Sequence, residues 1–309
     1  MDEIKVIEIA KSLLNFKRDY VVKGIDDDGA VLKIGKKYII LTSDMMLRET
    51  HIPEILSAYE IGARILTANV SDLLAMGAEP LAFLLSLAVD RDEKFIYELY
   101  RGLSDYSKHY NCPIVGGDTV KGDLILSGFA IGITNKPLFR EGKINDDIAV
   151  TNDIGRVYCS IYLYNLYKKG KISYKEFLNY AEKYKNIMEK LRKPVARMEI
   201  LDVKEFLHGA CDISDGLAKE IRYFKNFEIY GDKLLKSIPE DVLSFCDEFN
   251  LDPIKVALNS GEEFEILFTT DKLNKVKKHV KVNKIGKIIE NGQYIDGKEL
   301  KDIGYVHKW

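Results

Sequence analysis

The segment Ala68-Asn69-Val70-Ser71-Asp72-Leu73-Leu74-Ala75-Met76-Gly77 decides the fold class. It closes a stretch with helical periodicity over residues 53–76, and Gly77 is a usual stop signal for a helix. An apolar run over residues 81–89 follows at once and predicts a buried strand. Because helical and strand patterns alternate in this way along the whole chain, we predict an α/β or α+β fold.

The remaining patterns extend this alternation in both directions. They predict helices over residues 3–16, 92–110 and 156–192, a helix that opens at Asp215, and strands over residues 31–34, 38–42, 113–115, 124–133, 148–151, 265–268 and 284–289. A length of 309 residues favours two domains, and the polar stretch 135–147 is the candidate boundary. We therefore expect an N-terminal domain over residues 1–136 and a C-terminal domain over residues 137–309.

Composition and charge argue against several classes of function. The chain carries 46 basic and 48 acidic residues, and its net charge of −2 gives no electrostatic case for binding nucleic acid or an anionic membrane. No apolar run approaches the roughly 20 residues that span a bilayer, and no signal-peptide pattern follows Met1. The scattered cysteines predict neutral, buried thiols in a reducing compartment; they are Cys112, Cys159, Cys211 and Cys246. We expect a cytoplasmic protein.

Asp72 is the acidic residue that local pattern singles out. On a helical wheel it falls, with Asn69, inside the apolar stripe of Ala58, Ile61, Ile65 and Met76, while Glu60, Arg64, Thr67 and Ser71 lie on the other side. A buried carboxylate costs several kcal/mol unless it is paired or binds a metal ion. Capping of a neighbouring backbone segment is the alternative, and both remain open. Asn69 on the same face favours a polar site.

Further acidic motifs suit magnesium or phosphate in the same way. They are Asp26-Asp27-Asp28-Gly29, Thr42-Ser43-Asp44, Gly116-Gly117-Asp118-Thr119 and Asp212-Ile213-Ser214-Asp215-Gly216-Leu217. Carboxylates and hydroxyls are the ligands that Mg²⁺ prefers, and glycine-rich turns expose N–H groups to anions. Singly, each motif also fits a solvated turn, a polar loop, a tight turn or a helix N-cap. The glutamates at 262, 263 and 265 fit solvated charges at a strand edge.

In order and spacing, these motifs together resemble the thiamine-monophosphate kinase family, within the ATP-binding superfamily that includes aminoimidazole ribonucleotide synthetase. The resemblance covers nearly the whole chain. Besides the motifs above, it includes His51, Ala75-Met76-Gly77-Ala78-Glu79-Pro80, Arg140 and Gly261-Glu262-Glu263-Phe264-Glu265. The chain departs from the family pattern in the residues that flank Arg140, and at Ser260, Glu263 and Phe264, where the family has Gly, Asp and Tyr.

The resemblance implies a fold, a reaction and a set of site residues. The fold is a two-domain architecture like that of aminoimidazole ribonucleotide synthetase, with mixed sheets and helices on one face; an N-terminal domain binds ATP and magnesium and forms a homodimer, and a C-terminal α/β domain completes the active site. The reaction converts thiamine monophosphate and ATP to thiamine diphosphate and ADP, the last step of thiamine diphosphate biosynthesis. The implied ligands of several Mg²⁺ ions are Asp28, Thr42, Ser43, Asp44, Asp72, Asp118, Asp212 and Asp215. The implied ATP contacts are Gly117, Asp118, Arg140 and Ser214, and the implied contacts to thiamine monophosphate are His51, Glu262 and Tyr305.

This chemistry gives a reason for so many carboxylates. Donor and acceptor are both phosphates, and two unit like charges about 4 Å apart repel by roughly 4 kcal/mol at an effective dielectric constant near 20. Several Mg²⁺ ions offset that repulsion, so we expect direct in-line transfer. A phosphate is already a nucleophile at neutral pH, so no catalytic general base is required. The alternatives are another ATP-dependent synthetase of the superfamily and a nucleotide-binding regulator without catalysis.

Overall fold

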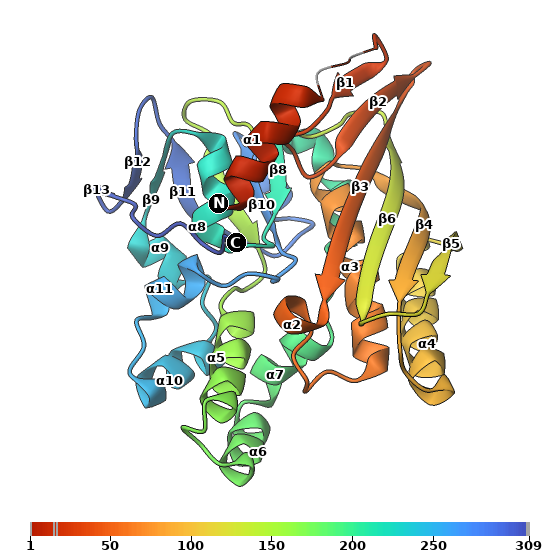
Figure 1. Cartoon of the computed structure of the whole chain (residues 1–309). Coiled ribbons are helices and arrows are strands. Elements are labelled where there is room, and N and C mark those ends of the chain that lie inside the picture. The colour runs from red at the N-terminus through yellow and green to blue at the C-terminus, as the bar shows by residue number, and fades with distance from the viewer. Residues whose placement is uncertain (1, 15, 17, 307–309) are drawn as a thin grey trace. The chain divides into compact units, whose positions relative to one another are not determined.

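The computed structural model describes residues 2–14, 16 and 18–306, and the chain divides into two compact units. The N-terminal unit consists of Lys11–Leu138 and Arg192–Leu201. The C-terminal unit consists of Phe139–Leu191 and the described parts of Met1–Ala10 and Asp202–Trp309. Each unit has its own sheet (Figure 1). Among the described residues, no helix is both long enough and apolar enough to cross a membrane.

The described part of the N-terminal unit is built on a six-stranded mixed sheet in the order β1-β2-β3-β6-β4-β5. Its strands are β1 (Val21–Lys23), β2 (Ala30–Ile34), β3 (Lys37–Leu47), β4 (Glu79–Ala88), β5 (Ile114–Val120) and β6 (Ile125–Thr134). Neighbouring strands are antiparallel except β4 and β5, which are parallel. The helices of this unit are α2 (Arg48–His51), α3 (Ala58–Ala75) and α4 (Glu93–His109).

Helix α3 lies against one face of this sheet, in contact with β3, β4 and β6, and α4 packs on α3 (Figure 1). The two helices approach closely because glycines face each other's backbone. A Cβ atom at Gly62 would lie 2.1 Å from the Leu99 carbonyl oxygen, and one at Gly102 would lie 2.0 Å from that of Tyr59. Ser57 and Glu60 form a capping box, so α3 begins at Ala58 and not at the predicted residue 53. It ends before Gly77, as predicted.

The helical wheel divides α3 into an apolar stripe and a polar side, but in the structure most of the polar side is buried as well. Arg64, Thr67 and Ser71 are buried together with the apolar stripe. The hydroxyls of Thr67 and Tyr110 lie 3.1 Å apart, and the Tyr110 hydroxyl accepts a hydrogen bond from the Ala196 backbone N–H. Asp72 itself is only half-buried, so the expectation that it is a buried carboxylate is wrong.

The described part of the C-terminal unit contains a seven-stranded sheet in the order β13-β12-β9-β11-β7-β10-β8. The strands are β7 (Asp147–Thr151), β8 (Gly209–Asp212), β9 (Phe227–Ile229), β10 (Ile266–Thr270), β11 (Val282–Ile288), β12 (Gln293–Ile295) and β13 (Lys298–Glu299). All pairs are antiparallel except β12 with β9. β8, β9, β12 and β13 were not predicted, because strands of two to four residues carry too short a pattern.

The helices of the C-terminal unit are α5 (Arg156–Lys168), α6 (Tyr174–Lys183), α7 (Lys185–Arg192), α8 (Leu217–Glu220), α9 (Gly231–Leu235), α10 (Glu240–Phe249), α11 (Pro253–Leu258) and α12 (Leu273–Val276), with most of α1 (Glu3–Leu13) and 3-10 turns at Lys204–Phe206 and Ile221–Phe224. The 3-10 turn Met198–Asp202 belongs mostly to the N-terminal unit. The single helical stretch predicted over residues 156–192 is therefore three helices. Gly170 at a positive φ follows the first, and the Ser173 capping box starts the second.

Candidate magnesium and phosphate site

Asp28, Thr42 and Asp72 come together in the N-terminal unit. A carboxylate oxygen of Asp28 and one of Asp72 lie within 4.8 Å of each other. The Thr42 hydroxyl donates a hydrogen bond to Asp72 at 2.5 Å, and Asp28 is only 7% exposed. Two unit charges at 4.8 Å repel by about 3.5 kcal/mol at an effective dielectric constant near 20. Close carboxylate and hydroxyl oxygens are the donor set that suits Mg²⁺, so these residues fit the implied ion.

The acidic turn before β2 directs two of its three carboxylates, those of Asp27 and Asp28, inward. Asp26 pairs with Lys11 at 2.7 Å, and Asp27 pairs with Lys23 at 3.4 Å while it accepts a hydrogen bond from the Asp28 N–H. Of the two buried members, Asp28 is the one that meets Asp72. The turn is therefore not a simple solvated acidic turn, and Asp26 is peripheral.

Strand alternation separates Thr42 from Ser43. Thr42 and Asp44 share the face of β3 that packs on α3, and the Asn69 side chain of that helix accepts a hydrogen bond from the Asp44 N–H at 3.3 Å. Ser43 lies on the other face, where its hydroxyl donates to the Gly128 carbonyl at 2.9 Å. Asn69 fits only because residue 128 is glycine: a Cβ there would lie 2.3 Å from the Asn69 amide nitrogen.

The Gly116-Gly117-Asp118-Thr119 motif is not the predicted turn but part of the exposed edge strand β5. Gly117 allows β5 to lie close to β4, since a Cβ would meet the Leu85 carbonyl oxygen at 1.8 Å. Asp118 pairs in register with Ser86, on the sheet face opposite Thr42 and Asp44. Three strand spacings separate β5 from β3, about 14 Å. Within one chain, Asp118 therefore does not join the Asp28–Asp72 pair.

His51 ends the short helix α2 beside the same sheet. Its Nδ1 lies 2.6 Å from the Thr50 hydroxyl and accepts a hydrogen bond from the Leu47 N–H at 3.3 Å. These local contacts orient the imidazole, which is half-buried.

In the C-terminal unit, Asp212 and Asp215 belong to one loop after β8. Asp212 is 1% exposed at the end of that strand, where it pairs in register with Ile266 of β10. Asp215 receives the Lys219 ammonium at 2.6 Å, and Glu3 lies 3.3 Å from the same nitrogen. Burial lowers the pKa of Lys219, but the attraction of Asp215 and then of Glu3 outweighs it, and the net pKa is raised.

The helix predicted to open at Asp215 is present, but its predicted first residue is wrong. Helix α8 begins at Leu217, after Gly216 in a positive-φ conformation, and spans four residues. Neither Ser214 nor Asp215 caps it; the Ser214 hydroxyl and the Asp215 N–H both donate to the Glu220 carboxylate, at 3.3 and 3.2 Å. Sequence reasoning missed Glu220. Helix α8 has only four residues, and so short a helix shows no periodic pattern that would indicate burial of its last residue.

A second turn, at residues 261–264, is bound to this loop by backbone hydrogen bonds. The Glu262 N–H donates to the Ser214 carbonyl at 2.6 Å, and the Tyr305 N–H donates to the Asp215 carbonyl at 2.9 Å. Glu262 and Phe264 both adopt positive φ, of 53° and 52°. The unit thus brings together Ser214, Asp215, Glu262 and Tyr305.

Glu263 and Glu265 are not solvated edge charges: both are fully buried. Glu263 accepts hydrogen bonds from the N–H groups of Gly155 and Val157, at 2.8 and 3.1 Å, and so supplies the N-terminal cap of α5. The Ser260 hydroxyl also donates to Glu263, at 2.6 Å, so two positions at which the chain departs from the family pattern are bonded to each other. Glu265 pairs with Lys190 at 2.6 Å.

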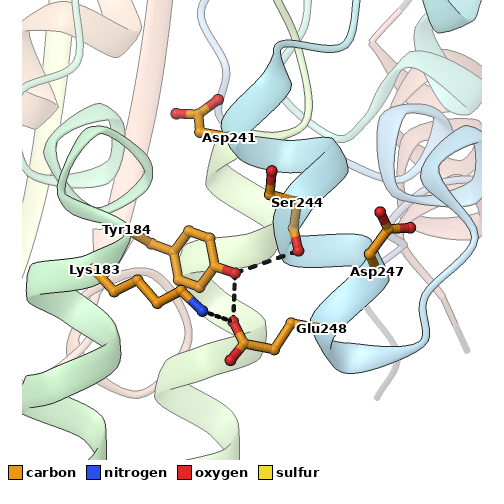
Figure 2. Close-up of a pocket in the computed structure, with 6 residues that line it drawn as sticks. All are labelled: Lys183, Tyr184, Asp241, Ser244, Asp247 and Glu248. Atoms are coloured by element: carbon orange, nitrogen blue, oxygen red, sulfur yellow. Dashed lines mark hydrogen bonds and ion pairs between the residues drawn. The ribbon is translucent and has the colours of Figure 1, made fainter.

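A shallow hollow elsewhere in the C-terminal unit is a packing junction (Figure 2). In it the Lys183 ammonium and the Tyr184 hydroxyl both donate hydrogen bonds to the Glu248 carboxylate. These two bonds lower the pKa of Glu248, and the bond from Lys183 has the larger effect. The Tyr184 hydroxyl lies 3.3 Å from the Ser244 carbonyl. These contacts tie the chain between α6 and α7 to α10.

Known proteins share the fold and much of the sequence. Residues 26–134 match the family described as AIR synthase related protein, N-terminal domain. A solved structure described as AaThiL complexed with AMPPCP and TMP is 25% identical, with a TM-score of 0.85 over 99% of this chain and 97% of that one. The fold and the carboxylate site therefore define a protein of the AIR synthase-related class.

Two curated relatives narrow the class further. Thiamine-monophosphate kinase of Methanocaldococcus jannaschii is 62% identical over 319 residues, which covers 100% of both chains. That of Pyrococcus abyssi is 34% identical over 305 residues, which covers 94% of this chain and 93% of the relative. The chain belongs to the thiamine-monophosphate kinase family. The resemblance and the fold class predicted from sequence are confirmed.

Proposed function

We propose that this protein transfers the γ-phosphate of ATP to thiamine monophosphate and so forms thiamine diphosphate and ADP. The observation that carries the proposal is full-length 62% identity to a thiamine-monophosphate kinase. The related solved structure holds AMPPCP, an ATP analogue, together with TMP, which fits the same pair of substrates. The pairing of Asp28 with Asp72 within 4.8 Å, beside Thr42, supports phosphate chemistry in this chain.

Asp28, Thr42, Asp44 and Asp72 of the N-terminal unit, with Asp212 and Asp215 of the C-terminal unit, are the residues we assign to magnesium. Bound Mg²⁺ supplies positive charge that offsets the repulsion between the donor and acceptor phosphates. Asp44 has its backbone fixed by Asn69, and Asp72 has its carboxylate fixed by the Thr42 hydroxyl. The Asp72 side chain is thus oriented before an ion arrives. Ser43 lies on the opposite sheet face, so we assign it no ligand role.

The other residues bind and orient the two substrates. Arg140 and Ser214 contact the phosphates of ATP, and His51, Glu262 and Tyr305 contact thiamine monophosphate. The acceptor phosphate is the nucleophile and carries no proton that must be removed at neutral pH, so transfer needs positioning more than a general base.

We also propose that the protein is a homodimer formed through the N-terminal unit. Met45, Val115 and Val120 of its sheet are 55%, 61% and 54% exposed, a large apolar exposure for β-strands. Asp118 and Gly117 lie on the exposed edge strand of this sheet. Their implied roles at ATP and magnesium would then serve the site of the neighbouring copy. Light scattering on wild type and on Met45→Lys tests the dimer: a monomeric wild type contradicts it.

A direct assay tests the activity. Purified protein, Mg²⁺-ATP and thiamine monophosphate are mixed, and thiamine diphosphate is measured by fluorescence after oxidation to the thiochrome form. We expect one thiamine diphosphate per ADP. ATP hydrolysis without this product would favour another reaction of the superfamily, and ATP binding without turnover would favour a regulator.

A further inference from the structure

Glu220 lies at the centre of the cluster formed by Ser214, Asp215 and Arg140 in the C-terminal unit, although its residue type and position in the sequence give no sign of this. Its side chain is only 1% exposed. One carboxylate oxygen accepts hydrogen bonds from the Ser214 hydroxyl at 3.3 Å and from the Asp215 N–H at 3.2 Å. The other lies 4.0 Å from the Arg140 guanidinium. A single buried carboxylate thus meets the loop after β8 and the arginine that precedes β7.

Arg140 is held from a second side by an aromatic ring. Its guanidinium carbon lies 3.9 Å from the centre of the Tyr223 ring, within the range of a cation–π contact. Its side chain is 15% exposed. A partly buried guanidinium placed between a carboxylate and a ring face keeps one orientation, because both neighbours restrict its rotation. A guanidinium presents its N–H donors in a fixed planar fork, which suits an oxyanion once the orientation of the group is set.

The charged residues of this cluster are paired in a way that suits a phosphate-binding site. Lys219 neutralises Asp215 at 2.6 Å, and Glu220 lies near Arg140 without a close bidentate pair. At 4.0 Å the Glu220 carboxylate attracts the Arg140 guanidinium and so helps to fix its position. Full removal of Glu220 would release the Ser214 hydroxyl, the Asp215 N–H and Arg140 together.

From this geometry we infer that Glu220 is a positioning residue for nucleotide binding: it holds Ser214 and Arg140 in the arrangement that receives the phosphates of ATP. The inference rests on the proposed function, since it assumes that these two residues contact ATP. It goes further because it assigns the positioning of the two ATP contacts, Ser214 and Arg140, to one buried side chain that does not itself touch the nucleotide. Loss of Glu220 should therefore weaken the binding of ATP much more than the binding of thiamine monophosphate.

The test uses Glu220→Gln, with Glu220→Asp as the conservative variant. Glutamine keeps the size and an acceptor oxygen, but its amide nitrogen cannot attract Arg140. We expect the Kd of Mg²⁺-AMPPCP, measured by calorimetry, to rise about tenfold or more, because glutamine lacks the negative charge that orients Arg140 and strengthens the hydrogen bond from Ser214. The KM for ATP should rise in parallel, with the KM for thiamine monophosphate within about twofold of wild type. Aspartate keeps the charge and should restore part of the affinity.

Glu265→Gln is the matched control. Glu265 is also a fully buried glutamate of the C-terminal unit with a cation and a hydroxyl as partners, Lys190 at 2.6 Å and Thr151 at 2.7 Å. It should lose stability without weaker AMPPCP binding. The inference is overturned if Glu220→Gln binds AMPPCP as wild type does, or if Glu265→Gln weakens binding equally. Failure of wild type to bind AMPPCP also overturns it. Absence of thiamine diphosphate with normal AMPPCP binding would refute only the proposed reaction.

Discussion

Replacement of Asp72 by asparagine separates the metal role of this residue from a structural one. In the protein without magnesium, Asp72 and Asp28 have carboxylate oxygens within 4.8 Å, a repulsion of about 3.5 kcal/mol at an effective dielectric constant near 20. Asp72 is only partly buried, so screening by solvent reduces this to about 1–2 kcal/mol. Asparagine has nearly the same volume and keeps an oxygen that accepts the Thr42 hydrogen bond. The metal-free variant should therefore be more stable than wild type.

The assays measure stability and activity side by side. In EDTA we expect the midpoint of thermal unfolding of Asp72→Asn to rise by about 2–4 °C, from about 2 °C per kcal/mol for a chain of this size. With Mg²⁺ and AMPPCP, wild type should be stabilised and the variant much less. The rate of thiamine diphosphate formation at millimolar Mg²⁺ should fall at least about 100-fold, since even outer-shell partners of a metal are typically worth 10–100-fold.

Asp26→Asn provides the control for this experiment. Asp26 is exposed and paired with Lys11, so its substitution should leave both unfolding and turnover near wild type. Near wild-type turnover of Asp72→Asn at ordinary Mg²⁺ would refute the metal role of Asp72. A lower unfolding temperature in EDTA would refute the argument from repulsion.

Three further outcomes follow from the contacts of single residues. Thr42→Val should raise the Mg²⁺ concentration needed for half-maximal activity by about tenfold, because Asp72 loses the hydroxyl that orients it. Ser43→Ala, on the opposite face of the sheet, should leave this concentration unchanged, and magnesium titration of the two variants compares them. Glu263→Ala should lower the free energy of unfolding in urea by about 3–5 kcal/mol, because buried N–H donors at the start of α5 lose their acceptor; an unchanged midpoint would show that water replaces it. Burial raises the pKa of Cys112 and of Cys246 to about 11, so at pH 8 only about 0.1% of either thiol is thiolate. Iodoacetamide should therefore alkylate both cysteines far more slowly in the folded protein than in urea-unfolded protein. Equal alkylation rates, measured by mass spectrometry, would contradict this.

Several features of the fold were predictable because they depend on near neighbours in the chain. The end of α3 before Gly77 and the strand that follows it are signalled by periodicity and by one glycine at a positive φ of 68°. The four cysteines are buried and lie outside disulfide bonds, as their scattered spacing predicted. The start of α3 was misplaced, because the pattern over residues 53–57 does not reveal that Ser57 and Glu60 cap each other.

The candidate site was predictable only as a set of residue types. The sequence by itself singled out Asp72 and gave, through the order of its motifs, the family that the curated relatives confirm. It did not decide between Thr42 and Ser43, or place Asp118, because alternation assigns a side chain to a face only after strand register is set by partners far along the chain.

Tertiary structure alone decided which acidic residues meet. The contact of Thr42 with Asp72 joins residues 30 positions apart, and the cap that Glu263 gives to α5 spans more than 100. Such contacts leave no periodic trace, so the sequence pattern indicates surface charges at Glu263 and Glu265 and gives no signal at Glu220. A buried carboxylate is stable only when donors from distant segments surround it, and those donors are assembled by folding. The segment that ends at Gly77 thus determined the class of fold, and the packing around its Asp72 determined the chemistry.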